Sequence, residues 1–266
     1  MVTTIDNENF VKEQYGNADN LNARINLHRF NTNKIDWNRW FFEKMNIPKH
    51  SNILELGCGN GLLWKNNEES INETLSITLS DFSEGMLLCA KQNINNENIK
   101  YEIIDIQNIP YENESFDIII SRHMLYHVPD IDKALSEVKR VLRPGGKFYV
   151  STNGKEHMQE LETLVTGYDK NINFDLQKYA NKFGIENGDK FLKKYFSNVT
   201  FEEFNGEIVV DNAEPVVSYI LSTNVARKSI FEEHSLDSFN KYVETEIDKV
   251  GAIKITTNTG IFIVSD

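Results

Sequence analysis

The chain is poor in cysteine and has no long apolar run. Its 266 residues include two cysteines, Cys58 and Cys89, which are too few for a disulfide framework and lack the pairing typical of zinc sites. No apolar stretch reaches the roughly 18 residues that a membrane helix needs, and residues 1–10 lack the apolar segment of a signal peptide. These absences predict a cytoplasmic protein with no membrane partner.

Positive charge is scarce as well. The chain carries 28 Lys and Arg against 40 Asp and Glu, a formal net charge of −12. A field of this sign repels phosphate backbones and anionic lipids, so nucleic acid is not expected as a partner. Apolar residues make up 40% and charged residues 26%, which excludes a disordered or low-complexity chain and predicts a globular protein.

Short apolar segments alternate with helical patterns between residues 52 and 152. This alternation is typical of βαβ units around a parallel sheet. Strands are predicted at residues 52–56, 74–79, 99–104, 116–121 and 147–151. Asp130 and Ser83 are placed as helix N-caps, and the helix after Asp130 is predicted to stop at Pro144-Gly145-Gly146.

Helical patterns dominate on both sides of this region. Strand-like patterns return at residues 199–204, 207–210 and 252–264, and we expect two late strands that extend the same sheet. We therefore predict one domain over residues 1–266. Its parts are a helical N-terminal segment (1–50), a core (51–152) and a region of helices and last strands (153–266).

A glycine-rich turn follows the first predicted strand. Residues 54–61 read Leu-Glu-Leu-Gly-Cys-Gly-Asn-Gly, with glycine at positions 57, 59 and 61 before a helix. Glycine tolerates the backbone angles of a tight turn and lets a ligand approach without meeting a Cβ. A plain strand-to-helix turn does not need three alternating glycines, so the pattern favours a cofactor site.

Two aspartates follow the next two predicted strands. Asp81 lies about 20 residues after Gly61, the offset at which a carboxylate reaches ribose hydroxyls. Asp105 lies one strand further and is placed to accept an adenine amino hydrogen, with Phe82 and Ile106 on the purine faces. A capping or turn role is the alternative for each aspartate. The glycine spacing departs from that of a dinucleotide turn and favours an adenosine with an amino acid tail.

These blocks resemble the class I S-adenosylmethionine-dependent methyltransferases, in particular those that act on small molecules. The resemblance rests on ILELGCGNG at residues 53–61, Asp81, Asp105, FDIIISRHMLYHVPD at 116–130 and VLRPGGKF at 141–148. It implies a Rossmann-like, doubly wound, seven-stranded sheet, mostly parallel with an antiparallel last strand at 252–264. It also implies a helical N-terminal lid, helical insertions after strand five, S-adenosylmethionine as cofactor and S-adenosylhomocysteine as product.

The same resemblance implies a set of site residues. The predicted cofactor-binding residues are Glu55, Gly57, Cys58, Gly59, Gly61, Asp81, Phe82, Ser83, Met86, Asp105, Ile106, Gln107, Ser121 and His123. Tyr15, Arg24 and His28 are predicted to belong to the lid and to face the substrate. Surface positions on a helix are the alternative for these three.

A sulfonium is already an activated leaving group, so the main tasks are to align the acceptor with the methyl group and to exclude water. If the acceptor carries a proton, His127 is the candidate base, because histidine titrates near neutral pH. Tyr126 is the second catalytic candidate. A hydrogen-bonded loop histidine is the alternative for His127. No metal is expected, because His123 and His127 lack a third ligand at a suitable spacing.

The sequence leaves the acceptor open and predicts methyl transfer to an O, N or C atom of a small molecule. Two other functions remain compatible with the same motifs. One is a nicotinamide-dependent oxidoreductase on a similar sheet, and the other is a catalytically silent module that binds S-adenosylmethionine.

Overall fold

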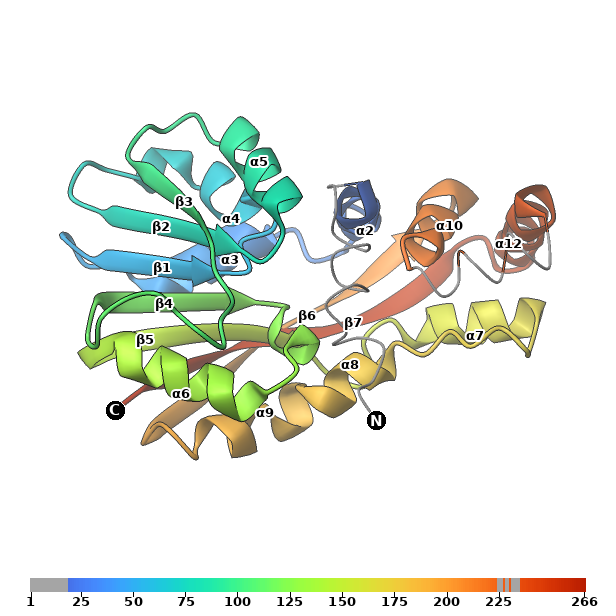
Figure 1. The fold of residues 1–266 in the computed structure, drawn as a ribbon. Helices are drawn as coiled ribbons and strands as arrows, with labels where there is room; N and C mark the ends of the chain where they lie inside the picture. Colours follow the sequence, from blue (N-terminus) through green and yellow to red (C-terminus); the bar gives the residue numbers. More distant parts are fainter. Residues whose placement is uncertain (1–18, 224–226, 228–229, 231–234) are drawn as a thin grey trace.

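The computed structural model describes residues 19–223, 227, 230 and 235–266. Its centre is a seven-stranded sheet with the strand order β3-β2-β1-β4-β5-β7-β6 (Figure 1). The strands are β1 (Asn52–Leu56), β2 (Ser76–Asp81), β3 (Ile99–Ile103), β4 (Phe116–Arg122), β5 (Leu142–Asn153), β6 (Asn198–Val210) and β7 (Ile253–Ser265). The predicted seven-stranded α/β fold is confirmed.

The strand directions also agree with the prediction. Strands β1 to β5 pair in parallel, and β7 is antiparallel to both of its neighbours, β5 and β6. The two segments predicted at residues 199–204 and 207–210 form one strand, because β7 pairs with β6 without interruption from Asn198 to Val210. The strand order reverses between β1 and β4, and ligands of open α/β sheets bind at such a switch point.

Helices occupy most connections between the strands. The described α-helices are α2 (Asp19–His28), α3 (Trp37–Met45), α4 (Leu62–Lys65), α5 (Glu84–Asn93), α6 (Ile131–Val141), α7 (Gln159–Tyr168), α8 (Gln177–Lys182), α9 (Ile185–Leu192), α10 (Ala213–Leu221) and α12 (Leu236–Val250). Both predicted caps are present, since Ser83 Oγ accepts the Met86 N–H at 3.3 Å and Asp130 Oδ1 accepts the Lys133 N–H at 2.9 Å. None of the described helices is long and apolar enough to cross a bilayer.

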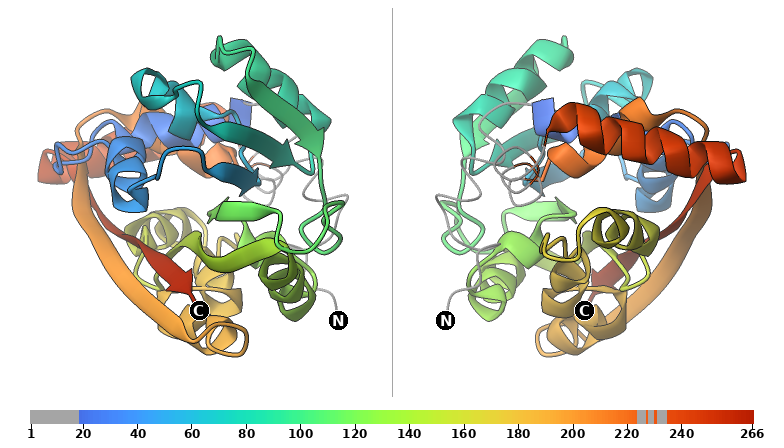
Figure 2. Two further views of the ribbon diagram at one scale, coloured as in Figure 1. Left: turned by 90° about the vertical axis from the view of Figure 1, so that its left-hand side faces the viewer. Right: turned by 90° about the vertical axis from the view of Figure 1, so that its right-hand side faces the viewer.

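Two helical layers cover the sheet (Figure 2). On one face, α6, α8 and α9 enclose a core that contains Leu54 and Leu56 of β1 and Val138 of α6. On the other face, α3, α4 and α5 enclose a second core with Ile53 of β1 and Trp64 of α4. Successive residues of β1 thus point into different cores, as expected for a strand that is buried on both faces.

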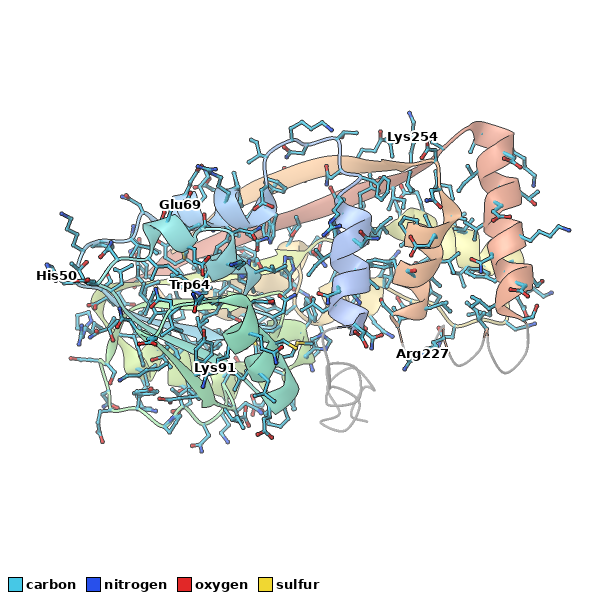
Figure 3. All side chains as sticks on the ribbon, turned by 90° about the horizontal axis from the view of Figure 1, so that it is seen from above. His50, Trp64, Glu69, Lys91, Arg227 and Lys254 are labelled. Carbon is cyan, nitrogen blue, oxygen red and sulfur yellow. The ribbon has the colours of Figure 1, made fainter. Side chains whose placement is uncertain are left out.

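The paired ends of β6 and β7 continue past the other strands (Figure 1). Helices α2, α7, α10 and α12 pack on this extension, and α2, α10 and α12 lie in a row when seen from above (Figure 3). A third core unites them and includes Leu27, Val165, Val216 and Phe239. We call these four helices, together with residues 206–210 and 253–257, the hairpin lobe.

Replacing Asp130 with alanine should lower the free energy of unfolding by about 1 kcal/mol, because the Lys133 N–H at the start of α6 loses its acceptor. Asp130→Asn is the matched variant, since its side-chain oxygen can still cap the helix, and it should retain most of the stability. Urea denaturation followed by circular dichroism measures both. Equal midpoints for wild type and Asp130→Ala would show that this cap does not stabilise the fold.

Candidate active site

The turn between β1 and α4 has a backbone conformation that favours glycine. Gly57, Gly59 and Gly61 have φ angles of 74°, 57° and 75°, in the left-handed region. A Cβ on Gly57 would lie 2.9 Å from Cγ of Met124, and one on Gly61 would lie 2.8 Å from Cδ1 of Ile94. Both the conformation and the close packing therefore require glycine at these positions.

Asp81, at the end of β2, lies directly against this turn. Its Oδ2 accepts the Gly59 N–H and its Oδ1 accepts the Ser83 N–H, each at 2.9 Å. Burial raises the pKa of the Asp81 carboxyl, and these backbone donors oppose the rise. Phe82 is half-buried, whereas Ser83 and Met86 are buried at the start of α5. Each carboxylate oxygen can accept a further hydrogen bond, so Asp81 retains capacity for a ligand.

Asp105 lies after β3 and forms a local network with Gln107. Its carboxylate accepts the backbone N–H of Gln107 at 2.9 Å and the side-chain amide of Gln107 at 3.1 Å. The Gln107 amide oxygen accepts the Asp130 N–H at 3.1 Å, which joins this loop to the start of α6. Ile106, which lies between Asp105 and Gln107 in the sequence, is buried. This arrangement is compatible with both predicted roles of Asp105, as a turn residue and as an acceptor for the adenine amino group.

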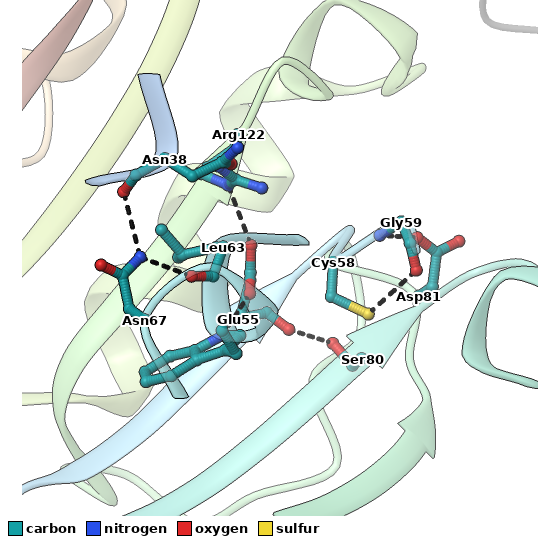
Figure 4. A network of polar contacts seen from close by, with 10 residues as sticks. Asn38, Glu55, Cys58, Gly59, Leu63, Asn67, Ser80, Asp81 and Arg122 are labelled. Carbon is teal, nitrogen blue, oxygen red and sulfur yellow. Dashed lines mark hydrogen bonds and ion pairs between the residues drawn. The ribbon is translucent and has the colours of Figure 1, made fainter. Parts of the chain in front are cut away.

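Glu55 is held by protein groups on both of its oxygens (Figure 4). Trp64 donates its Nε1–H to Oε2 at 2.7 Å, and Arg122 donates from Nε to Oε1 at 3.1 Å. Arg122 also donates to Oδ1 of Asn38 at 2.8 Å. Glu55 is fully buried, and this burial raises its pKa while Arg122 and Trp64 act to lower it. The geometry supports a role beneath the glycine turn, anchoring β4 and α4 to β1.

Cys58 is buried within the turn, and its thiol contacts the Gly59 carbonyl oxygen at 3.6 Å. Burial raises the pKa of this thiol well above its usual value, so little reactive thiolate forms. We expect a thiol reagent such as Ellman's reagent to modify Cys58 only after denaturation. The variant Cys89→Ser isolates this thiol, because the chain has two cysteines. Rapid modification of folded Cys89→Ser would contradict the prediction.

Polar atoms without a hydrogen-bond partner gather at the end of β4. Within the described residues, neither Ser121 Oγ nor His123 Nδ1 has a partner, although both atoms are buried. His123 has a φ of 50° and donates its backbone N–H to the Ser151 carbonyl oxygen at 3.0 Å. Burial, followed by the neighbouring charge of Arg122, lowers the His123 pKa to about 3. Its ring is therefore neutral at physiological pH.

The two predicted catalytic residues lie in the short 3-10 helix η3 (Leu125–His127). His127 is half-buried, with its ring edge-on to Tyr126 and to Tyr179 of α8 at centroid distances of 4.8 Å and 5.5 Å. Tyr126 is 8% exposed and belongs to the core that lies against α6. The packing explains how η3 is held, and the catalytic role of His127 and Tyr126 stays a prediction.

Helix α2 lies across the glycine turn. A Cβ on Gly59 would meet Leu21 of α2 at 3.3 Å, and Asn60 donates from its side chain to Asn22 at 3.2 Å. Arg24 donates from Nε to Ser222 Oγ at 3.0 Å and so joins α2 to the end of α10. Helix α2 thus contacts the glycine turn, and the lid role of this segment stays a prediction.

Of the other two predicted lid residues, His28 lies within the described residues and Tyr15 does not. His28, in the last turn of α2, stacks on His157 with ring centroids 6.1 Å apart. His28 as a residue is exposed, yet desolvation by the surrounding protein lowers the pKa of its ring to about 4. Tyr15 lies outside the described residues.

A family model described as a methyltransferase domain matches residues 54–150. This segment contains the glycine turn, Asp81, Asp105 and the end of β4. Residues 54–150 of this chain are therefore similar to a methyltransferase domain. The matched segment extends from within β1 to within β5, and the hairpin lobe lies outside it.

Curated relatives match over the same part of the chain. A demethylmenaquinone methyltransferase of Lactobacillus johnsonii is 33% identical over 133 residues, which are 48% of this chain and 53% of the relative. A ubiquinone biosynthesis O-methyltransferase of Coxiella burnetii is 31% identical over 127 residues, which are 47% of this chain and 53% of the relative. The chain therefore spans about half the length of the curated relatives it matches.

A solved structure extends the likeness in fold to most of the chain. Phosphoethanolamine N-methyltransferase 2 of Haemonchus contortus, in complex with S-adenosyl-L-methionine, superposes with a TM-score of 0.56 at 18% sequence identity. The match covers 91% of this chain and 56% of that one. At this identity the likeness shows the shared fold alone.

Several residues that lie near the glycine turn or near His28 were not identified from the sequence. Arg122 is the partner of Glu55, His157 stacks on His28, and Asn258 donates its backbone N–H to His157. No motif or spacing links these positions, because they come from different strands and loops. Among the described residues, no group of three or more His, Cys, Asp or Glu side chains is arranged to hold a metal ion.

Proposed function

We propose that this chain transfers a methyl group from S-adenosylmethionine to a small-molecule acceptor. The observation that carries the proposal is the Asp81 carboxylate, whose Oδ2 lies 2.9 Å from the Gly59 N–H in a turn of three left-handed glycines. A carboxylate at this position supports the binding of ribose hydroxyls, because a ligand can approach the glycine backbone closely. The matched methyltransferase family supports the same function.

The residues at the switch point fit the parts of this cofactor. Asp81 accepts hydrogen bonds from the ribose, and Asp105, one strand further out, accepts one from the adenine. The unpaired Ser121 Oγ and His123 Nδ1, at the end of β4, provide polar atoms on the opposite side of β1. The methionine part then lies toward β4. When bound, S-adenosylmethionine supplies an activated methyl group, and this chain orients it and excludes water.

The acceptor lies next to the methionine part, over the ends of β4 and β5. Helix α2 covers this region, with Tyr15, Arg24 and His28 as the proposed lid residues, and His127 and Tyr126 as the catalytic residues named by the sequence. The printed names of relatives and neighbours refer to menaquinone, ubiquinone and phosphoethanolamine compounds. These names support a small-molecule acceptor for this chain. We further propose a single domain over residues 1–266, located in the cytoplasm, that does not bind nucleic acid.

The comparisons do not support the other two functions. The matched family and the named relatives are methyltransferases, which favours neither a nicotinamide-dependent oxidoreductase nor a catalytically silent module. The glycine spacing agrees with this choice, because it departs from that of dinucleotide turns.

Calorimetric titration with S-adenosylhomocysteine and, separately, with NAD⁺ tests the proposal. We expect S-adenosylhomocysteine to bind and NAD⁺ not to bind. Incubation with methyl-labelled S-adenosylmethionine and a small-molecule cell extract should then label at least one product. Binding of NAD⁺ without binding of S-adenosylhomocysteine would overturn the proposed function, and cofactor binding without any labelled product would favour the silent module.

A further inference from the structure

Helix α8 carries a half-buried lysine, Lys178. Its ammonium nitrogen lies 5.3 Å from the centre of the Tyr179 ring. Within the described part of the chain, this nitrogen has neither a hydrogen bond nor an ion pair. An ammonium group that loses water on burial needs hydrogen bonds or an opposite charge in return. Lys178 is therefore a cation whose ammonium group can bind an anionic ligand.

The carboxylates of Asp175 and Glu162 act on Lys178 without forming an ion pair with it. Desolvation lowers the pKa of Lys178, and the charges of Asp175 and Glu162, which raise it, do not reverse this effect. Both carboxylates are engaged with the backbone, since Asp175 Oδ1 accepts the Lys178 N–H at 3.1 Å and Glu162 Oε1 accepts the Gln177 N–H at 3.2 Å. The positive charge of Lys178 is thus only partly compensated.

Aromatic contacts connect Lys178 with the segment that follows β4. The Tyr179 ring lies 5.2 Å from the Tyr126 ring and 5.5 Å from the His127 ring, measured between centroids. Tyr126 and His127 belong to η3, so the Tyr179 ring contacts both the Lys178 ammonium group and the two catalytic candidates. The ammonium group of Lys178 therefore lies at the edge of the region proposed for the acceptor.

A second positive charge acts on Lys178 from α2. Desolvation is the first of the causes that lower the Lys178 pKa, and the charge of Arg24 adds to it. Arg24 lies three residues after Leu21, which packs beside Gly59, and it donates to Oγ and to the carbonyl oxygen of Ser222 at 3.0 Å and 3.2 Å. Two positive charges that act on each other raise the energy of the region, and an anion bound near both lowers it.

The charge of the cofactor requires the anion to lie away from the methyl group. S-adenosylmethionine carries a positive sulfonium, which Lys178 and Arg24 would repel at short range. An anionic group of the acceptor is attracted by both side chains, whereas the nucleophilic atom must meet the methyl carbon in line. One acceptor can satisfy both demands when its nucleophile points toward the sulfonium and its anion toward Lys178 and Arg24.

We propose that Lys178, together with Arg24, binds an anionic group of the methyl acceptor, a carboxylate or a phosphate that is not itself methylated. This inference rests on the proposed function and specifies its acceptor class. The chain has a formal net charge of −12, so its general field repels anions. A local pair of cations is then what admits an anionic acceptor, and Lys178 is a specificity-determining residue.

Ligand-observed nuclear magnetic resonance tests the anion site in the full chain. With S-adenosylhomocysteine at saturation, benzoate and phenyl phosphate are titrated as anionic probes, and benzamide is titrated as an uncharged probe of similar shape, all at constant ionic strength. We expect at least one anionic probe to bind at least tenfold more tightly than benzamide. The anionic probe that binds more tightly identifies the anion as a carboxylate or a phosphate.

Substitutions of Lys178 separate the effect of its charge from that of its bulk. Lys178→Gln should weaken the binding of the tighter anionic probe at least fivefold, and Lys178→Arg, which keeps the positive charge, should bind it within twofold of the wild type. Lys190→Gln is the matched control, because it removes the charge of an exposed lysine on the neighbouring helix α9, and it should not change probe binding. All three variants should bind S-adenosylhomocysteine within twofold of the wild type.

Labelling of an extract gives an independent readout. Incubation with methyl-labelled S-adenosylmethionine and a small-molecule cell extract should yield a labelled product that an anion-exchange resin retains at neutral pH, because the acceptor keeps its anionic group. Lys178→Gln should raise the extract concentration needed for half-maximal labelling at least fivefold, with little change in the maximal rate, since the loss of a binding contact raises KM more than it lowers kcat.

The outcomes separate this inference from the proposed function. If the wild type does not bind S-adenosylhomocysteine, the proposed function fails. If it binds S-adenosylhomocysteine but neither anionic probe binds more tightly than benzamide, or if the labelled product is neutral or cationic, only the present inference is overturned. A large loss of S-adenosylhomocysteine affinity in Lys178→Gln would also overturn it, because that result would assign Lys178 to the carboxylate of the cofactor.

Discussion

Replacing Asp81 with alanine should weaken the binding of S-adenosylhomocysteine at least tenfold. The carboxylate is positioned to accept both ribose hydroxyls, and a hydrogen bond to a charged acceptor contributes about 1.5 to 3 kcal/mol. The variant also removes the acceptors of the Gly59 and Ser83 N–H groups, which loosens the turn that the ligand must contact. Isothermal titration calorimetry gives the dissociation constants directly.

Asp117→Ala is the matched control for this measurement. Asp117 also accepts a backbone N–H, from Asn52 at 2.7 Å, but it lies at the amino ends of the strands, away from the glycine turn. Its substitution should lower stability and leave the affinity for S-adenosylhomocysteine unchanged. An unchanged dissociation constant for Asp81→Ala would count decisively against the role of Asp81.

The pH dependence of binding provides a second test of Asp81. Burial raises the pKa of this carboxyl, and protonation removes an acceptor for the ribose. The affinity of the wild type for S-adenosylhomocysteine should therefore fall as the pH is lowered toward that raised pKa. Asp81→Ala should lack this part of the pH dependence.

Replacing Glu55 with alanine should destabilise the fold by about 3 to 5 kcal/mol, the usual cost of breaking a buried ion pair by removing one partner. The Arg122 side chain is only 12% exposed and would lose its carboxylate. The Trp64 Nε1–H would lose its acceptor as well. Urea denaturation followed by tryptophan fluorescence measures the loss.

Glu246→Ala is the control for the Glu55 experiment, because it breaks the exposed pair with Lys249 on α12. Exposed pairs contribute about 0 to 1 kcal/mol, so its effect should be small. The loss of stability for Glu55→Gln should lie between the losses for Glu55→Ala and Glu246→Ala, since the amide retains one oxygen for Trp64 or Arg122. A loss for Glu55→Ala as small as that for Glu246→Ala would show that this buried pair does not hold the strands together.

Local sequence patterns predict the parts of this fold that depend on neighbouring residues. The caps at Ser83 and Asp130 each involve a side chain and an N–H three residues later. The glycine turn likewise depends on backbone angles set within residues 57–61. By contrast, the single strand β6 was predicted in two pieces, because its continuity depends on pairing with β7, which lies far away in the sequence.

The sequence by itself determined the order of the strands and helices, the glycine turn and the acids at the ends of β2 and β3, because hydrophobic periodicity and turn chemistry are local properties. Only the tertiary structure decided that Glu55 pairs with Arg122 and that His28 stacks on His157. These contacts join residues that are separated along the chain, and they arise when packed cores bring α2 and the ends of β4 and β5 together. No spacing pattern within the sequence predicts these contacts.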